Sequence, residues 1–136
     1  MIQPIVHDPL FLAQKSETAT EDDSQTVADL LDTLHANLSR CVGMAANMIG
    51  VKKRIIAVCH GPVLMVMINP QIISMSGAYE TEEGCLSLAG TRKTKRYRRI
   101  TVRYQDQRFR QRTASFDGFT AQIIQHEVDH CSGILI

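Results

Sequence analysis

The sequence lacks the features that indicate a membrane or a nucleic acid as partner. Its 15 lysines and arginines nearly balance 14 aspartates and glutamates, so the net charge of +1 favours neither partner. No apolar run is long enough to span a bilayer, and residues 1–4 lack the basic region and apolar run of a signal peptide. We therefore expect a cytoplasmic protein with no membrane partner and no specific nucleic-acid partner.

Cysteines are also few, at four, and the chain does not resemble a small scaffold held together by disulfides. Nothing in the sequence indicates an oxidising compartment, so we expect free thiols that are available as metal ligands. A length of 136 residues, with 44% apolar and 21% charged residues, is typical of one globular domain with its own core. The prediction is a single domain over residues 1–136.

Apolar spacing predicts one helix in the first third of the chain and several short strands after it. Apolar residues from Val27 to Leu38 recur at helical intervals, which predicts an amphipathic helix over residues 24–39. A turn at residues 60–62 should join two strands, and Asn69-Pro70 should end the second of them. The expected strands are residues 54–59, 63–68, 71–75 and 99–105.

A second helix should begin after Asp117, a good N-cap residue, and end near Gly133, a good C-cap residue. His126 and His130 lie on one face of this helix, together with apolar residues, so both should point into the core. Short strands around this buried helix predict an α+β fold. In that fold, small antiparallel or mixed β-sheets surround a central helix, and the first amphipathic helix packs outside.

The stretch from His126 to His130 places two imidazoles and a carboxylate in the pattern of a divalent-metal site. Residues four apart lie one above the other on a helix, and Glu127 is placed to move a proton of a metal-activated water. The alternative is a helix that carries two histidines and an acid for structural reasons. Asp129 either helps to orient a ligand or is a surface acid.

A third ligand is needed, because catalytic sites of this kind take three protein ligands and keep one open position. Cys85 is the best candidate, since Gly84 allows a close backbone approach and Leu86 offers an amide N–H. A site made of one cysteine and two histidines suits the hydrolysis of an amide. The alternative is that Cys85 is only a small buried apolar residue.

Two sequence blocks, Glu-Gly-Cys-Leu-Ser at 83–87 and Gln-His-Glu-Val-Asp-His at 125–130, resemble those of the peptide deformylases. The resemblance implies an enzyme that removes the formyl group from N-formylmethionyl peptides of nascent proteins and releases formate. It also implies that Cys85, His126 and His130 bind one divalent metal, typically Fe²⁺ with Zn²⁺, Ni²⁺ or Co²⁺ as substitutes. Glu127 would act as the general acid and base, and the Leu86 N–H would bind the formyl oxygen.

A third block departs from the family pattern, which reads Gly-x-Gly-aliphatic-Ala-Ala-x-Gln. Cys41 stands where the first glycine is expected, and Met48 stands where the glutamine is expected. Loss of one such hydrogen-bond donor typically costs about 10²–10³ in rate. The alternative reading is therefore a degenerate relative that binds a metal or a peptide with weak or no activity. The expected substrate groove is lined by Val42, Gly43, Met48, Gly84, Phe119 and Ile123.

Other readings remain open at the level of sequence. A metalloendopeptidase would cut internal peptide bonds, and a hydrolase with Cys85 as nucleophile would work without a metal. The basic run over residues 92–103 could contact ribosomal RNA, but a charged, solvated strand edge fits it better because few aromatics are interleaved. One of its arginines could instead contact the backbone of a substrate peptide.

Overall fold

A computed structural model describes all residues from 1 to 136 and shows one antiparallel sheet wrapped around a helix. The predicted α+β class and the central helix are confirmed, and the strands form one five-stranded sheet in the order β1-β2-β3-β4-β5. The elements are α1 (Pro9–Leu12), a 3₁₀-helix η1 (Glu21–Asp23), α2 (Ser24–Ala36), β1 (Gly43–Ala45), a 3₁₀-helix η2 (Ala46–Ile49), β2 (Ile55–His60), β3 (Val63–Cys85), β4 (Leu88–Gln105), β5 (Gln111–Asp117) and α3 (Gly118–Cys131).

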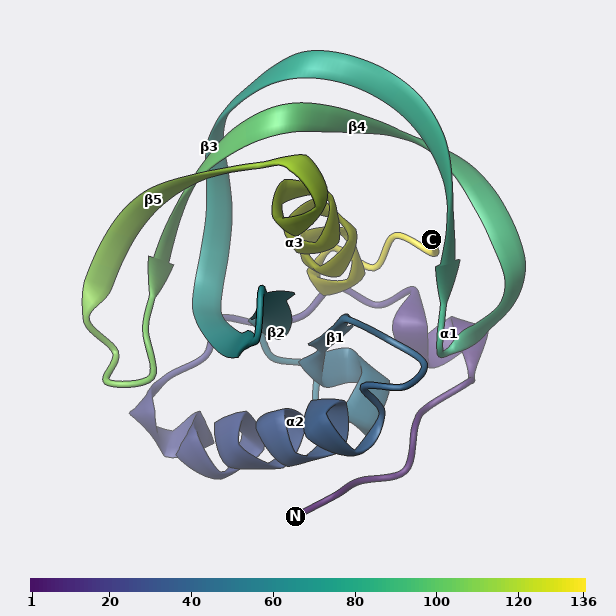
Figure 1. Ribbon diagram of the computed structural model, residues 1–136. Coiled ribbons are helices and arrows are strands. Elements are labelled where there is room, and N and C mark those ends of the chain that lie inside the picture. Colours follow the sequence, from purple (N-terminus) through teal and green to yellow (C-terminus); the bar gives the residue numbers. More distant parts are fainter.

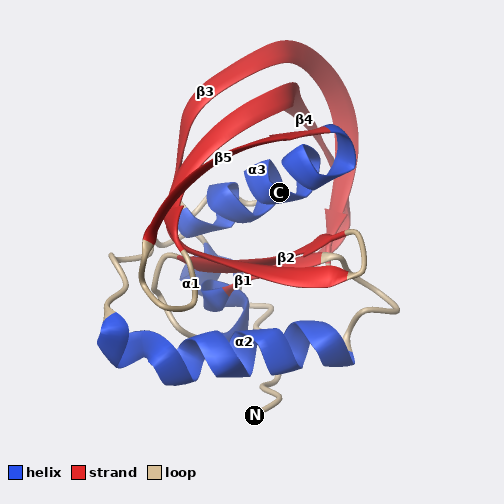
Figure 2. Cartoon of the chain, turned by 60° about the vertical axis from the view of Figure 1, so that its left-hand side comes forward, coloured by secondary structure: helices blue, strands red, loops and turns tan.

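The sheet bends so far that it covers α3 from two sides. Figures 1 and 2 show β3, β4 and β5 arching over α3, while β1 and β2 lie beneath the helix. Strand β3, at 23 residues, joins the two layers, because its first residues pair with β2 and most of the remainder pair with β4. The strand ends at Cys85, which lies beside the helix that carries the histidines.

The prediction that Asn69-Pro70 ends a strand is wrong, because β3 continues through these residues. The pairing with β4 shifts register between Ile68 and Gln71, which marks a bulge. Asn69 has a φ of 52°, a conformation that asparagine tolerates better than most residues, and its side chain bonds to the N–H and the carbonyl of Ala19 at 2.8 and 3.0 Å. Asn69-Pro70 therefore does not end the strand but forms the bulge at which β3 passes from one layer of the sheet to the other.

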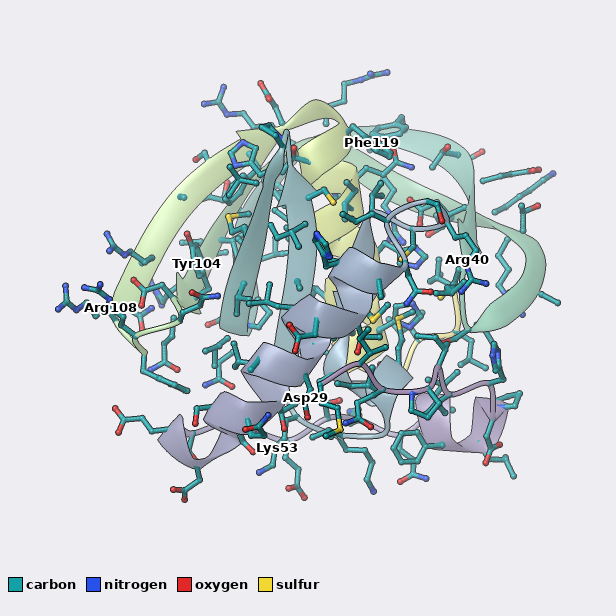
Figure 3. The ribbon with its side chains drawn as sticks, turned by 60° about the horizontal axis from the view of Figure 1, so that its bottom comes forward. Asp29, Arg40, Lys53, Tyr104, Arg108 and Phe119 are labelled. Atoms are coloured by element: carbon teal, nitrogen blue, oxygen red, sulfur yellow. The ribbon has the colours of Figure 1, made fainter.

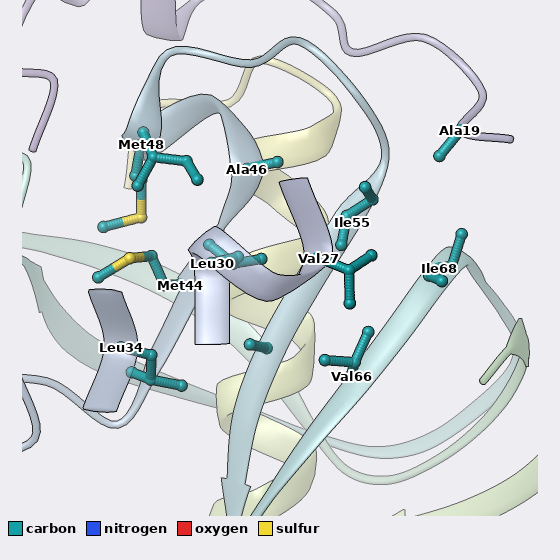
Figure 4. Close-up of a cluster of buried hydrophobic side chains, with 12 residues drawn as sticks. Ala19, Val27, Leu30, Leu34, Met44, Ala46, Met48, Ile55, Val66 and Ile68 are labelled. Carbon is teal, nitrogen blue, oxygen red and sulfur yellow. The ribbon is translucent and has the colours of Figure 1, made fainter. Parts of the chain in front are cut away.

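Helix α2 begins where it was predicted and ends three residues earlier than predicted. A reciprocal pair of hydrogen bonds between Thr20 and Asp23 starts the helical segment. The helix then buries Val27, Leu30 and Leu34 against β1, β2 and the first part of β3. Figure 4 shows these side chains packed against Met44, Met48, Ile55, Val66 and Ile68.

Helix α3 is buried along most of its length, between β1–β2 and the arch. Its ends fit the prediction, with Asp117 as the N-cap and Gly133, at a φ of 76°, just after the last turn. Ile100 and Val102 of β4 face the helix together, as their alternation predicted. The helices of this fold are short, and none is both long and apolar enough to cross a membrane. The core therefore holds α3, with its two histidines, in a fixed position.

Candidate metal centre and active site

Three donor atoms converge where the end of β3 meets α3. Cys85 is the last residue of β3, and His126 and His130 occupy successive turns of α3. The Nε2 atom of His130 lies 3.1 Å from Nε2 of His126 and 3.3 Å from Sγ of Cys85. All three atoms lie within 4.8 Å of one another. Ligands about 2.0–2.3 Å from a tetrahedral metal are roughly 3.3–3.7 Å apart, so the trio fits one ion.

The two imidazoles present the same nitrogen to this point but have different surroundings. His126 Nδ1 lies 2.9 Å from a carboxylate oxygen of Glu83, which directs its Nε2 toward the other donors. His130 is fully buried, and its Nδ1 has no hydrogen-bond partner on the protein. Burial, with the neighbouring His126, lowers the pKa of His130 to about 3. His130 is therefore neutral, the form that binds a metal.

A buried ion-pair network surrounds Glu83. Arg96 donates to the Glu83 carboxylate through Nη2 at 2.6 Å and through Nε at 3.0 and 3.1 Å, and Gln122 donates to it at 2.9 Å. Burial would raise the pKa of Glu83, but hydrogen bonds with His126, Arg96 and Gln122 outweigh it and hold the pKa at about 2. Glu83 is thus an anion that orients the His126 ring.

This network corrects the view of the basic run as wholly solvated, because Arg96 is only 3% exposed. It also assigns Asp129, which accepts a hydrogen bond from Arg96 Nη1 at 2.7 Å and so acts on His126 through Arg96 and Glu83. Sequence reasoning missed the roles of Glu83, Arg96 and Gln122. The available signal was the position of Glu83 inside a motif, whereas Arg96 was hidden among exposed arginines and lysines.

Glu127 lies beside the donor cluster and is only 4% exposed. Burial raises the pKa of its carboxyl to about 7, and its Oε1 has no partner on the protein. Gly43 of β1 packs closely against it, since a Cβ added at Gly43 would lie 2.9 Å from Glu127 Oε2 and 2.6 Å from Ile123 Cγ2. A carboxyl with a pKa near neutrality can both accept and donate a proton at physiological pH.

These residues open into a cleft of about 730 Å³. The cleft is bordered by β1 and η2 on one side and by α3 and the end of β3 on the other. Phe119 is 63% exposed, and Figure 3 places it at the surface, so it belongs to the rim of the cleft. The residues predicted for the groove all line the cleft, together with Leu86: Val42, Gly43, Met48, Gly84, Phe119 and Ile123.

The two departures from the family pattern both lie in the β1–η2 wall. Met48 is 1% exposed, and its sulfur accepts a weak hydrogen bond from the Ala45 N–H at 3.5 Å. This side chain offers the cleft no donor. Cys41 is half-buried, and burial raises the pKa of its thiol to about 11, so the thiol is neutral. Cys131 is a buried neutral thiol that packs in the core, with a pKa raised by burial to about 12.

The segment before α1 makes hydrogen bonds to both sides of the cleft. The sequence analysis did not predict this role. The Val6 N–H donates to the Met48 carbonyl at 2.8 Å, and His7 Nδ1 lies 3.0 Å from the Ser87 carbonyl, two residues beyond Cys85. One short segment thus contacts both η2 and the loop that follows the cysteine. No regular spacing marks it in the sequence, because it forms neither a helix nor a strand.

Comparisons with known proteins agree with this geometry. The family model described as polypeptide deformylase matches residues 2–136. A peptide deformylase of Clostridium beijerinckii is 60% identical over 136 residues, which cover all of both chains. One from Dictyoglomus turgidum is 38% identical over 134 residues, covering 96% of this chain and 86% of the relative.

Solved structures show the same likeness in three dimensions. The crystal structure of the peptide deformylase from Thermotoga maritima superposes with a TM-score of 0.89 at 29% identity, covering 99% of this chain and 95% of that chain. The actinonin-bound class I type b peptide deformylase from Acinetobacter baumannii gives 0.86 at 33% identity, with 99% and 95% covered.

Proposed function

This chain belongs to the peptide deformylase family, and we infer that it is an enzyme that hydrolyses the formyl group of N-formylmethionyl peptides, releasing formate and a free amine. The observation that carries this conclusion is the cluster of Cys85, His126 and His130 beside a buried carboxylate in an open cleft. The comparisons support this activity, not the alternative of a degenerate relative.

Peptide deformylases depend on a metal, and Cys85, His126 and His130 are the residues we propose as its ligands. The donor set of one thiolate and two imidazoles suits Fe²⁺ as well as Zn²⁺, Ni²⁺ or Co²⁺, and we propose Fe²⁺. When bound, the metal supplies Lewis acidity and activates a water molecule for attack on the formyl carbon. Glu83 contributes by holding the His126 ring in the orientation that binds.

Glu127 is the proposed general base and acid. Its carboxylate takes a proton from the attacking water, and the resulting carboxylic acid then gives a proton to the departing amine. The water oxygen becomes part of formate, and the bond between the formyl carbon and the peptide nitrogen breaks. Burial suits both steps, because it keeps the pKa of Glu127 near neutrality.

The formyl oxygen of the substrate needs a hydrogen-bond donor, and the rest of the peptide needs a groove to lie in. We propose the Leu86 N–H as the donor to the formyl oxygen, which leaves the Met48 wall without a matching donor. The peptide would lie between Val42–Gly43 and Gly84, and its methionine side chain would contact Ile123 and Phe119. Apolar contacts of this kind discriminate weakly between similar side chains.

The cytoplasm is the proposed location, because formylated nascent peptides arise there. A ribosome contact through residues 92–103 finds little support in the register of the arch. Lys93 and Lys95 of β4 lie opposite Glu82 and Glu80 of β3. Such opposite charges favour a charged strand edge over a surface for ribosomal RNA.

The test is formate release from a formylmethionyl peptide by anaerobically purified, iron-loaded protein. We expect turnover that falls about 10²–10⁴-fold in Glu127→Ala, because that variant has no group to move the proton. Removal of the metal by a chelator should abolish turnover and its return should restore it. Turnover that persists without metal would instead identify Cys85 as a nucleophile, and cleavage of internal peptide bonds alone would identify an endopeptidase.

A further inference from the structure

Arg40 is the only lysine or arginine among the residues that line the cleft. The other charged groups on the cleft wall are the carboxylates of Glu82, Glu83 and Glu127. Glu82 lies opposite Lys93 in the register of β3 and β4, Glu83 is paired inside the protein with Arg96, and Glu127 belongs to the proposed reaction. Arg40 therefore gives one part of the cleft mouth a positive charge that the chemistry of formyl hydrolysis does not require.

The charge of Arg40 is held in place but not neutralised. Its Nη2 donates to the Asn37 side-chain oxygen at 2.6 Å, and the Asn37 side chain is anchored in turn to the Thr33 carbonyl at 2.7 Å. Asn37 is a neutral amide, and no ion pair of the protein includes Arg40. A guanidinium that is fixed at one edge keeps further N–H donors for a ligand, arranged to match a carboxylate.

The position of Arg40 relative to the reacting group defines which part of a substrate it would meet. Gly43 packs against Glu127, and Arg40 lies three residues before Gly43. Three residues span at most about 11 Å of backbone, so the Cα atom of Arg40 lies no farther than that from Gly43, and both Arg40 and Glu127 line the same cleft. Arg40 and Phe119 both line the cleft, and Figure 3 labels both in the right-hand half of its view.

An extended substrate peptide is long enough to reach from Glu127 to the region of Arg40. With the formyl group beside Glu127 and methionine as the first residue, the second and third residues extend about 7–10 Å from the reacting carbon. We propose that Arg40 selects formylmethionyl peptides that carry an aspartate or glutamate at the second or third position. This inference rests on the proposed function, and it names the substrate class that this chain's cleft prefers.

The expected effect is modest, because the guanidinium is exposed to solvent. Exposed ion pairs contribute about 0.2–1 kcal/mol, which corresponds to roughly a 1.5- to fivefold change in affinity. Lysine at the same peptide position would be repelled by a similar factor. We therefore expect kcat/KM to be about three- to tenfold higher for aspartate than for lysine at low salt, mainly through KM, and the ratio to shrink as salt increases.

The experiment compares formyl-Met-X-Ala-Ser and formyl-Met-Ala-X-Ser peptides, where X is Asp, Asn or Lys, with the metal-loaded enzyme. The peptides carry a C-terminal amide, so that their own terminal carboxylate cannot bind Arg40. Arg40→Gln should bring the Asp-to-Lys ratio of kcat/KM close to one at the preferred position, and Arg40→Glu should invert it. Thermal unfolding of each variant checks that it is folded.

Arg108→Gln is the matched control, because Arg108 is exposed on the loop before β5, away from the cleft (Figure 3). Its Asp-to-Lys ratio should equal that of the wild type. A ratio that is the same in the wild type, Arg40→Gln and Arg40→Glu would overturn the proposal. If no formyl peptide is hydrolysed at all, the proposed function fails. The affinities of Met-Asp-Ala-Ser-amide and Met-Lys-Ala-Ser-amide, measured by calorimetry, then decide the role of Arg40 separately.

Discussion

The two walls of the cleft differ in how their polar groups are satisfied. On the wall of α3 and β3, Glu83 accepts hydrogen bonds from Gln122 and from Arg96 of β4 behind the wall, and it lies 2.9 Å from Nδ1 of His126, a proposed metal ligand. On the wall of β1 and η2, buried apolar side chains such as Met48 fill the same depth. The first wall carries the proposed metal ligands, and a change there disrupts several linked hydrogen bonds. The second wall shapes the space for the substrate, and both departures from the family pattern, Cys41 and Met48, occur there.

The largest expected effect comes from removing the cation of the polar wall. Arg96→Met leaves the Glu83 carboxylate buried without its ion pair, which should cost about 3–5 kcal/mol of unfolding free energy. His126 also loses a firmly held partner, so metal affinity should fall about 10–100-fold. Denaturant unfolding and a metal-competition titration measure the two effects.

The control for that variant is Arg98→Met on the same strand. Arg98 is exposed and contacts the ring of Tyr79 at 4.9 Å, so its replacement should cost less than about 1 kcal/mol and leave metal affinity unchanged. Equal losses in the two variants would mean that the polar wall does not depend on the Glu83–Arg96 pair.

The second prediction gives the apolar wall a donor. Met48→Gln should raise formate release by as much as about 10²–10³-fold if a missing donor limits the rate. Burying the amide should cost about 1–3 kcal/mol of stability. Met44→Gln is the matched control, because Met44 is buried in the same cluster and does not line the cleft. An unchanged rate in Met48→Gln would show that the Leu86 side of the cleft is sufficient.

The third prediction concerns the carboxyl that lies between the two walls. Burial raises the pKa of Glu127 from 4.5 to about 7, so in this pH window the folded protein binds more protons than the unfolded chain. The stability of the metal-free protein should therefore fall as pH rises from 4.5 to 7, by roughly 2–3 kcal/mol from this residue. Glu127→Gln should remove this loss.

The test is to measure the unfolding free energy of the metal-free wild type and of metal-free Glu127→Gln at pH 5 and at pH 8. The difference between the two proteins is then compared between the two pH values. Relative to the wild type, the variant should gain stability only at the higher pH. If Glu127→Gln is stabilised equally at pH 5 and pH 8, the cause is not the buried charge of Glu127.

The smallest expected effect tests how closely the walls approach. Gly43→Ala places a methyl group 2.6 Å from Ile123 and 2.9 Å from Glu127, so one wall must move, at a cost of about 1–3 kcal/mol. Because Glu127 is displaced, kcat should fall as well. Gly84→Ala is the control for stability, since its Cβ would meet nothing nearer than 3.6 Å. Thermal unfolding that is equal for both variants would contradict the close approach.

The sequence predicted most of the features that depend on spacing within one element. The ends of α3, the shared direction of His126 and His130 and the alternation of Ile100 and Val102 all follow from helix or strand periodicity. Cys85 was found as well, because it lies in a distinctive block. Each of these needs only neighbours along the chain.

Features that depend on register between elements were not predictable in this way. Arg96 reaches Glu83 across the β3–β4 pair, although its strand neighbour is Tyr79, and no local pattern separates it from the exposed Arg98 and Arg99. Asn69-Pro70 has the composition of a turn, and only its contact with the distant Ala19 makes it a bulge within a strand. Tertiary contacts decide both cases.

The long strand β3 has a consequence for the order in which the protein is made. Cys85, at its end, leaves the ribosome before either histidine, and His130 follows 45 residues later. The strands of the arch are therefore synthesised before the helix that fills it. A chain interrupted before α3 carries only one of the three proposed metal ligands, Cys85, so the proposed site cannot be assembled until α3 has been made.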